Sequence, residues 1–559
     1  MRRSLRFALL TLTVGLGLLT AGNAFATTYY IAANGADANS GTSKSAPWLH
    51  APGMPNCTSV CAGVSPQPGD KFIFRGGDTW HFGNSSLSPY VGSNWSWSGS
   101  GNSSACNLQA SAGPIVTTSC IYIGVDQTWY SGGSWTRPIF NLDNPLSNGR
   151  PSSCTYDESI GGVFGSYANY LILDNFEETG LCWNTNSLSD NMDLDGTMVE
   201  VSNWYVHGWT FGASSTLDNK TMIAGDSTAG YALVKGLVCD GSDASLGNST
   251  TYSSGDCIGG LGVSLEVEQS VFNHVSNGCV CGAYSVHDNL FENMYGSQGT
   301  THTNIVEQDN GGGNTQPYPT YFYNNVIHDI YLGVGVWLTP GVGDNAYIFN
   351  NVIYNNHNNC FLVSGNGTSG VSNYYFKNNT LDYTVGGCNF IIDSQMTSNA
   401  INGTIFFQNN HGIGYSPAAW SSVWGTTGTP VSQTVTDLGD ETMQSEAAAN
   451  AQGYTTANNY APTNSGGATV GAGANVASSC STFSPDLALC SGTSGGVLEQ
   501  SGSGGKIAVY SVGAPPRNLP ADCTPIADVT GCWDVGAYLF SSGIVSQPIA
   551  PTGLVASSQ

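Results

Sequence analysis

Basic residues are scarce in this sequence. Only 13 of its 559 residues are Lys or Arg, against 38 Asp or Glu, and no Arg occurs between Arg150 and Arg517. A general nucleic-acid-binding protein needs a basic surface, so this composition excludes that class. It also argues, more weakly, against a cleft for polyanions. The acidic charge itself is typical of a protein that stays in solution.

Long apolar runs are absent after the N-terminus, which argues against a membrane span. Residues 1–26 have the pattern of a cleaved export signal. Three Arg precede the apolar residues 7–19, and Ala24-Phe25-Ala26 offers a cleavage site. A retained anchor is the alternative. Removal of the signal leaves 10 Lys and Arg against 38 Asp and Glu, a net charge of −28. We therefore expect a secreted protein that acts as a monomer.

Short Asn-containing phrases return along the middle of the chain. They begin at Asp288, Asn324, Asn350, Asn378 and Asn409, in steps of 36, 26, 28 and 31 residues. A run rich in aromatic and β-branched residues precedes each phrase, and another apolar run follows. Strand, Asn turn, strand, loop and strand make one coil of a β-solenoid. Asn suits the turn because it tolerates left-handed dihedrals and bonds its own backbone, or a copy of itself one coil away.

The 16 cysteines lack the doubled Cys-x-x-Cys motif of zinc sites, and in an exported chain they indicate disulfides. Cys360 and Cys388 each lie ten residues after an Asn turn, so we expect a bridge between neighbouring coils. Cys279 lies in a similar column but has Cys281 as its neighbour in sequence, and its pairing stays open. Other sequence neighbours that could pair are Cys57 with Cys61, Cys106 with Cys120, Cys154 with Cys182, Cys239 with Cys257, Cys480 with Cys490, and Cys523 with Cys532.

Both ends of the chain carry phrases of a known kind. Residues 29–42 read YYIAANGADANSGT, residues 68–74 read PGDKFIF, and residues 533–538 read WDVGAY. Together with the repeat, these phrases resemble secreted bacterial right-handed parallel β-helix proteins of the pectate-lyase-like fold. The resemblance implies the fold but no single function, because this fold hosts lyases, hydrolases, epimerases, adhesins and phage spikes.

The expected fold class is therefore all-β: a right-handed parallel β-helix (solenoid) with an N-terminal cap and a disulfide-bearing C-terminal region. A β-sandwich or a propeller array is the runner-up. The expected divisions are a signal at 1–26, the cap and first coils at 27–150, the β-helix body at 151–430, C-terminal coils or cap at 431–540, and a flexible tail at 541–559.

A polar coil interrupts the apolar pattern near residue 305. Glu307 and Asp309 are two residues apart, so on a strand they share a face, with Cα atoms about 6.6 Å apart. An acid and base pair can flank a glycosidic bond in this way. We predict Glu307 as the acid, Asp309 as base or nucleophile, and His302 as a group that orients the substrate. A solvated strand face with an ordinary loop is the alternative.

The phase of the repeat predicts which residues stack beside this pair. It aligns Val306-Glu307 with Trp337-Leu338 and with Leu362-Val363 on one sheet. Trp337 would then offer a stacking face for a sugar. His328, one coil on, would also contribute to substrate binding.

Two further patterns concern a metal site and a catalytic base. Asn191, Asp193 and Asp195 have the alternating oxygen ligands of a Ca²⁺ loop, with an acidic turn as the alternative and no certain cofactor. Lyases of this fold usually use an Arg or Lys base, often with calcium. In the body the only basic candidates are Lys220, Lys235 and Lys377.

Two classes of function follow. The first is a carbohydrate-active enzyme that cleaves an extracellular polysaccharide by carboxylate acid/base chemistry, with a Ca²⁺-dependent Lys-base lyase as its alternative. The second is a non-catalytic adhesin or glycan-binding β-helix. In both cases the expected partner is an extracellular polysaccharide or glycan, with no nucleic acid.

Overall fold

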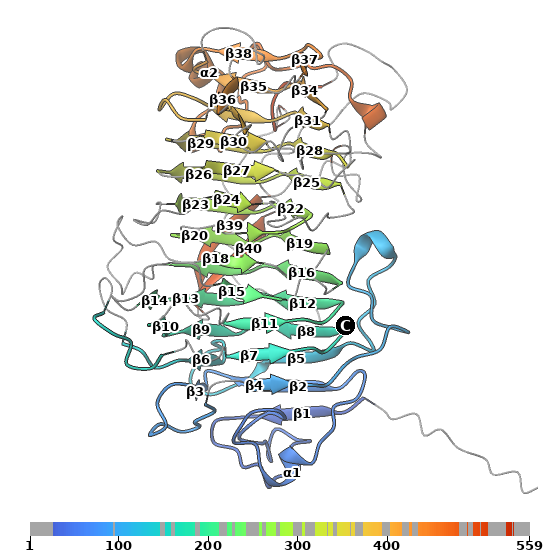
Figure 1. Cartoon of the computed structure of the whole chain (residues 1–559), viewed down its shortest axis with the longest axis vertical. Helices are drawn as coiled ribbons and strands as arrows, with labels where there is room; N and C mark the ends of the chain where they lie inside the picture. Colours follow the sequence, from blue (N-terminus) through green and yellow to red (C-terminus); the bar gives the residue numbers. More distant parts are fainter. Residues whose placement is uncertain are drawn as a thin grey trace, which may run out of the picture.

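Three long parallel sheets run along the molecule, and the chain visits each in turn as it winds (Figure 1). The computed structural model describes residues 26–92, 95–145, 151–157, 163–184, 191–211, 221–225, 230–241, 256–259, 264–275, 280–294, 304–307, 319–331, 334–338, 344–357, 359–363, 373–388, 390–393, 403–415, 424–427, 434–479, 489, 496–502, 505–511, 533–538 and 540. The predicted signal, residues 1–26, lies almost entirely outside them.

We name the sheets A, B and C in the order in which a coil enters them. Sheet A contains β1 (Thr28–Ile31), β2 (Lys71–Gly76), β5 (Ile121–Tyr130), β8 (Leu171–Asp174), β12 (Val199–Ser202), β16 (Tyr231–Lys235), β19 (Ser264–Glu268), β22 (Ser285–His287), β25 (Thr320–Tyr323), β28 (Ala346–Phe349), β31 (Tyr374–Lys377), β34 (Thr404–Gln408) and β37 (Thr434–Asp437).

Sheet B contains β3 (Thr79–His81), β6 (Ile139–Asn141), β9 (Glu177–Thr179), β13 (Tyr205–His207), β17 (Val238–Asp240), β20 (Val271–Asn273), β23 (Leu290–Met294), β26 (Val326–Ile330), β29 (Val352–Asn356), β32 (Thr380–Asp382), β35 (His411–Ile413) and β38 (Thr442–Gln444). Sheet C contains β4 (Trp95–Trp97), β7 (Phe164–Ser166), β11 (Met192–Leu194), β15 (Thr221–Ala224), β18 (Asp256–Gly259), β21 (Val280–Cys281), β24 (Asn304–Glu307), β27 (Val334–Leu338), β30 (Asn359–Val363), β33 (Phe390–Asp393) and β36 (Trp424–Thr427).

Smaller elements complete the described chain. They are α1 (Ser59–Ala62), the 3₁₀ turns η1 (Ala110–Ala112), η5 (Thr456–Asn458) and η6 (Ala477–Ser479), α2 (Glu446–Gln452), the pair β10 (Cys182–Trp183) and β14 (Thr210–Phe211), and the hairpin β39 (Gly496–Gly502) and β40 (Gly505–Ser511). No helix among the described residues is long and apolar enough to cross a membrane.

Neighbouring strands of the three sheets belong to successive coils and are parallel throughout. For example, β25 pairs with β28, β26 with β29, and β27 with β30. The predicted right-handed parallel β-helix is therefore confirmed. The runner-up folds, a propeller or a β-sandwich, are built from antiparallel strands and do not describe these three sheets.

The corner between sheets A and B explains the Asn phrases. Its first residue has a left-handed backbone, with φ of 56° at Asn324, 57° at Asn350 and 53° at Asn378. Asn tolerates this conformation better than other residues with a side chain. The next residue, also Asn in these coils, is buried and immediately precedes the strand of sheet B.

These second Asn residues form a continuous ladder inside the corner. The side-chain oxygen of Asn351 accepts bonds from the backbone N–H of Asn325 at 3.1 Å and from its Nδ2 at 3.1 Å. In the next coil, the side-chain oxygen of Asn379 accepts from the backbone N–H of Asn351 at 3.0 Å and from its Nδ2 at 2.9 Å. Each bond fixes the next coil at the same register, so the predicted bonding between copies one coil apart is confirmed.

One inward position of sheet B carries a carboxyl group. Glu178 pairs in register with Phe140 on one side and Val206 on the other, so its side chain faces the core. Burial raises its pKa to about 8, and Asn191 is the polar side chain beside it. Glu178 therefore favours its neutral form over a wider pH range than an exposed Glu does.

The first prediction concerns the effect of Glu178 on stability. Between its ordinary pKa of 4.5 and about 8, the folded chain keeps a proton that the unfolded chain has released. The free energy of unfolding therefore falls as pH rises through this window. Glu178→Gln should remove this loss, on the order of 4 kcal/mol at about pH 9. Thermal melts of the parent, Glu178→Gln and the exposed control Glu446→Gln at about pH 5 and pH 9 measure it. Equal pH slopes in all three proteins would contradict the expectation.

Five disulfides agree with the sequence-based pairs. Cys360 and Cys388 bridge neighbouring coils, with Cα atoms 4.2 Å apart. The other confirmed pairs are Cys57–Cys61, Cys106–Cys120, Cys154–Cys182 and Cys239–Cys257. The predicted pairs Cys480–Cys490 and Cys523–Cys532 lie outside the described residues, as does Cys279.

The C-terminal hairpin β39–β40 folds back over the middle of the helix. It contacts the outer face of sheet B at β13, β17, β20 and β23 (Figure 1). Val497 packs in one apolar cluster with Val238, Val271 and Leu290. Lys506 places Nζ 2.6 Å from the buried carboxylate of Asp240.

On sheet C, the pairing of β24 with β27 differs by one residue from the sequence-based alignment, whereas the predicted alignment of Trp337-Leu338 with Leu362-Val363 is confirmed. Glu307 pairs with Trp337, whereas the repeat phase had placed it beside Leu338. The arc between the Asn corner and sheet C varies in length from coil to coil. Positions counted from the Asn corner therefore do not always predict the register on sheet C.

Candidate functional site

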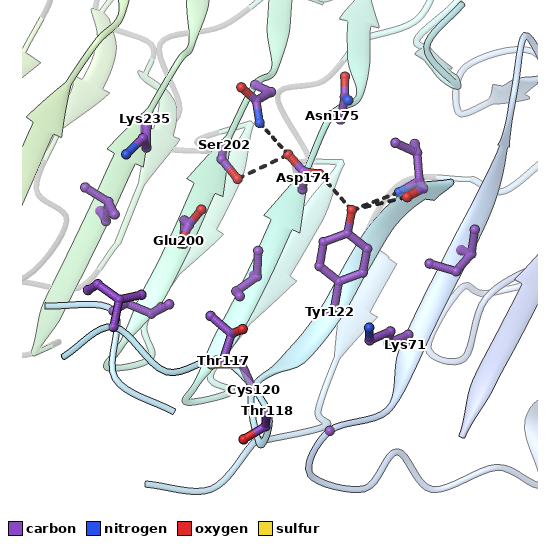
Figure 2. A pocket seen from close by; sticks show the side chains of 18 of the residues that line it. Lys71, Thr117, Thr118, Cys120, Tyr122, Asp174, Asn175, Glu200, Ser202 and Lys235 are labelled. Carbon is purple, nitrogen blue, oxygen red and sulfur yellow. Dashed lines mark hydrogen bonds between the residues drawn. The ribbon is translucent and has the colours of Figure 1, made fainter. Parts of the chain in front are cut away.

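A groove of about 1460 Å³ lies over the outer face of sheet A (Figure 2). Its floor is formed by the strands of sheet A from β1 to β19, namely β1, β2, β5, β8, β12, β16 and β19. Its wall is formed by the loop between β4 and β5. Of the residues considered from the sequence, the candidate base Lys235 lines it, whereas none of the predicted carboxylate, sugar-binding or calcium-binding residues does. Several ionisable side chains gather in this groove.

The strand registers explain the polar floor. The four strands β8, β12, β16 and β19 alternate apolar residues inward with polar or mixed residues outward. Glu200 pairs with Ile172 and Leu233, and Ser202 pairs with Asp174 and Lys235. Two outward columns result, and they carry the carboxyl groups of Asp174, Glu200, Glu266 and Glu268.

Asp174 is held by three donors. The hydroxyl of Tyr122 donates to Oδ2 at 2.7 Å, Asn203 Nδ2 donates to Oδ1 at 2.7 Å, and Ser202 Oγ donates to Oδ1 at 3.3 Å (Figure 2). Burial raises the pKa of Asp174, and these donors, which favour the ionised form, oppose the rise. The carboxylate is thus fixed in position with its charge supported.

Glu200 lies on the neighbouring coil. From a strand spacing of about 4.8 Å and a two-residue offset, its Cα lies roughly 8 Å from that of Asp174. Burial raises the pKa of Glu200, and repulsion from Asp174 adds to the rise. Both carboxyls thus have a raised pKa, and three side-chain donors favour the ionised form of Asp174. Two adjacent carboxyls in different surroundings suit acid and base roles.

The far end of the groove holds a tightly bonded group. Burial tends to raise the pKa of Glu266, but bonds from His287, Tyr231 and Tyr284 outweigh it and leave that pKa lowered. Lys235 Nζ lies 2.6 Å from Glu268 Oε1. These charges compensate one another, and Lys235 also attracts the Glu200 carboxylate.

The wall of the groove is a rigid loop. The Cys106–Cys120 disulfide closes it, and Asn107 and Val116 exchange backbone bonds of 2.7 and 3.0 Å across it. Ile115 lines the groove with 53% of its surface exposed. An apolar wall facing a polar floor fits a sugar ring, which has an apolar face and hydroxyl edges.

The three predicted lysine bases have different positions. Lys220 lies outside the described residues. Burial tends to lower the pKa of Lys235, but Glu268 outweighs it and raises that pKa, which is unfavourable for a base. Burial lowers the pKa of Lys377 to about 8, yet this side chain is buried and donates to Ser479 Oγ at 2.9 Å.

The sequence-predicted site is only partly described. Asp309 and His302 lie outside the described residues. Glu307 accepts a bond from Asn304 Nδ2 at 2.8 Å on sheet C, and its neighbour Trp337 is buried. His328 stands on sheet B, where its ring stacks on Tyr354 with centroids 4.8 Å apart. The structure thus places Glu307 beside Trp337 but His328 on another sheet.

The predicted calcium loop is split between the inside and the outside of the helix. Asn191 is buried beside Glu178, whereas Asp193 is exposed and Asp195 is half-buried. The structure therefore does not bring these three side chains together. The described part of the chain contains no group of three or more His, Cys, Asp or Glu side chains placed to hold a metal ion.

Sequence reasoning missed the groove, although a signal was present. The strands Leu171–Asp174, Val199–Ser202 and Ser264–Glu268 place carboxyl groups at outward positions of otherwise apolar strands. Such residues on successive coils must lie side by side on a parallel sheet. The corners of two of these coils carry a single Asn, Asn175 and Asn203, without the second Asn of the regular phrase, so the repeat counted from Asp288 did not include them.

Comparison with known proteins gives only distant similarity. No family model and no curated protein matches the sequence. Among solved structures, a rhamnogalacturonan lyase is 14% identical, with 74% of this chain and 87% of that chain covered and a TM-score of 0.34. Pectate lyase Pel9A is 13% identical over 75% and 78%, with a TM-score of 0.32. GH136 lacto-N-biosidase from Eubacterium ramulus is 11% identical over 75% and 68%, with a TM-score of 0.33. TM-scores this low carry no argument, and the fold rests on the strand registers of this chain.

The second prediction tests the support of Asp174. Tyr122→Phe removes one donor to the carboxylate, so the pKa of Asp174 should rise by about one unit. Carboxyl-carbon NMR of aspartate-labelled protein measures it, with the Asp174 signal assigned by its absence in Asp174→Asn. Tyr167→Phe, at a tyrosine that is 81% exposed, is the matched control. An unchanged titration midpoint in Tyr122→Phe would show that the hydroxyl does not support the charge.

Proposed function

We propose that this protein is a carbohydrate-active enzyme that cleaves an extracellular glycan in the groove over sheet A. Glu200 acts as the general acid and Asp174 as the ionised base or nucleophile. The observation that carries the proposal is the pair itself: two carboxyls on neighbouring coils of an open groove, both with a pKa raised by burial, of which Asp174 is held by three donors that favour its ionised form.

The chemistry follows from the position of the two groups. A sugar chain in the groove would pass between the apolar wall at Ile115 and the polar floor. Glu200 would give its proton to the glycosidic oxygen, and Asp174 would attack the anomeric carbon or activate a water. Cα atoms roughly 8 Å apart allow carboxyl separations of either hydrolase class.

A lyase with a Lys base is the second candidate. It would need a lysine in the groove that releases its proton near neutral pH, and the bond between Lys235 and Glu268 works against this. The earlier pair of Glu307 and Asp309, with His302, Trp337 and His328, remains a further proposal for the site of cleavage. So does a non-catalytic glycan-binding role.

The third prediction is the test of catalysis. The protein is incubated with a panel of neutral, acidic and amino polysaccharides, and both reducing ends and unsaturated ends are measured. Hydrolysis should give reducing ends alone. Glu200→Gln and Asp174→Asn should each lower turnover roughly a hundredfold or more, because each removes a proton-transfer or nucleophilic role.

Matched variants locate the site. Glu446→Gln, at an exposed glutamate on α2, should leave turnover unchanged. Glu307→Gln and Asp309→Asn test the alternative site on sheet C. If these two lose activity and the groove variants keep it, cleavage occurs on sheet C. Unsaturated ends would identify a lyase, and no product from any glycan would leave binding as the function.

A further inference from the structure

We propose that Arg137 is a positioning residue for Asp174, and that the C-terminal hairpin holds Arg137 in place. The inference deepens the proposed function and rests on it for its catalytic consequence. It starts from a cation that sequence analysis did not consider, because it lies before the β-helix body.

Arg137 is buried at the corner between sheets A and B. Only 2% of its surface is exposed. Its Nε donates to the side-chain oxygen of Asn175 at 3.0 Å and to the carbonyl of Asn203 at 3.1 Å. The guanidinium thereby ties together the corners of two successive coils.

One of these corners leads directly to the groove. Asn203 accepts from Arg137 through its carbonyl and donates to Asp174 through Nδ2, at 2.7 Å. The positive charge of Arg137 also favours the ionised form of Asp174. Arg137 therefore acts on Asp174 both through Asn203 and through its charge.

The third contact of Arg137 comes from the other end of the chain. Its Nη1 donates to the carbonyl of Lys506, at the start of β40, at 3.0 Å. Lys506 is itself fixed to sheet B by its bond with Asp240. A hairpin on the outside of sheet B thus reaches, through one guanidinium, a carboxylate on sheet A.

Other charged groups around this link must be considered. Glu177 attracts Arg137, and burial lowers the pKa of Arg137 only to about 10, so it stays charged at neutral pH. Glu200 lies on the neighbouring strand and repels the Asp174 charge. Tyr122 and Ser202 donate to Asp174 from β5 and β12. Arg137 is thus a positive charge that opposes the effects of burial and of Glu200 on the pKa of Asp174.

The fourth prediction tests the link in the full chain. Arg137→Met should raise the titration midpoint of Asp174 by about one pH unit, measured by carboxyl-carbon NMR. Arg137→Lys keeps the charge but not the planar fork, so its shift should be clearly smaller. The acidic limb of kcat/KM should move with the midpoint, with a fall in kcat and little change in KM.

A glycine substitution tests the hairpin independently of Arg137. A Cβ on Gly505 would lie 2.8 Å from the ring of Tyr205, so Gly505→Ala should push the hairpin and Lys506 outward. The midpoint of Asp174 should rise, by less than in Arg137→Met. Gly386→Ala is the matched control, because Gly386 has a similar φ of 82° but open space around its Cβ position.

The outcomes separate the claims. An unchanged midpoint in Arg137→Met overturns the proposal, and so does an equal shift in Arg137→Lys, because lost packing would then be the cause. If Gly505→Ala behaves like Gly386→Ala, the hairpin does not seat Arg137; this arm also serves if Arg137→Met fails to fold. If the titration midpoint of Asp174 moves while the acidic limb of kcat/KM stays fixed, the link from Arg137 to Asp174 is supported. The same result removes Asp174 from the proposed mechanism.

Discussion

The Asn ladder at the corner between sheets A and B is the interaction on which the architecture of the regular coils depends. Each amide oxygen satisfies the N–H and the side chain of the Asn one coil below, and each Nδ2 also reaches a backbone carbonyl, as Asn351 reaches Phe322 at 3.0 Å. Buried amides that lose such partners are costly, so a slip by one residue in any coil is disfavoured. The ladder therefore fixes which residues face outward in the coils from Asn289 to Asn410.

Fixed registers give the outer face of sheet A two different halves. In its N-terminal half, the outward columns carry carboxyls beneath an open groove. In its C-terminal half, one of these outward columns carries Tyr321, Tyr347 and Tyr375, whose neighbouring rings stack with centroids 5.4 Å apart. Residues from the C-terminal region, Val476 and Trp533 among them, share an apolar cluster with Tyr321 and Tyr347. One sheet thus offers an open polar floor at one end and a covered aromatic face at the other.

The parts that could be predicted from the sequence are those fixed by local chemistry. The repeated Asn residues, which lie at left-handed corners, predicted the coil. Cysteines at equivalent positions predicted bridges between neighbouring coils such as Cys360–Cys388. The pair of Asp174 and Glu200 was missed because the repeat was counted on the phrases from Asp288 onward, whereas the corners beside this pair carry only a single Asn each, Asn175 and Asn203. Arg137 was also missed, since its partners Asn175, Asn203 and Lys506 are brought together only by the stacked fold.

The hairpin over sheet B has a consequence for how the chain comes to be folded. Synthesis delivers β13 to β23 long before residues 496–511 exist. Until the hairpin arrives, Val238, Val271 and Leu290 form an uncovered apolar stripe on strands that are already stacked. A chain that lacks its C-terminus would keep that stripe open in the middle of the molecule, where strand-forming segments of other chains could dock. Truncation at one end would thus turn the centre of the solenoid into a site of aggregation.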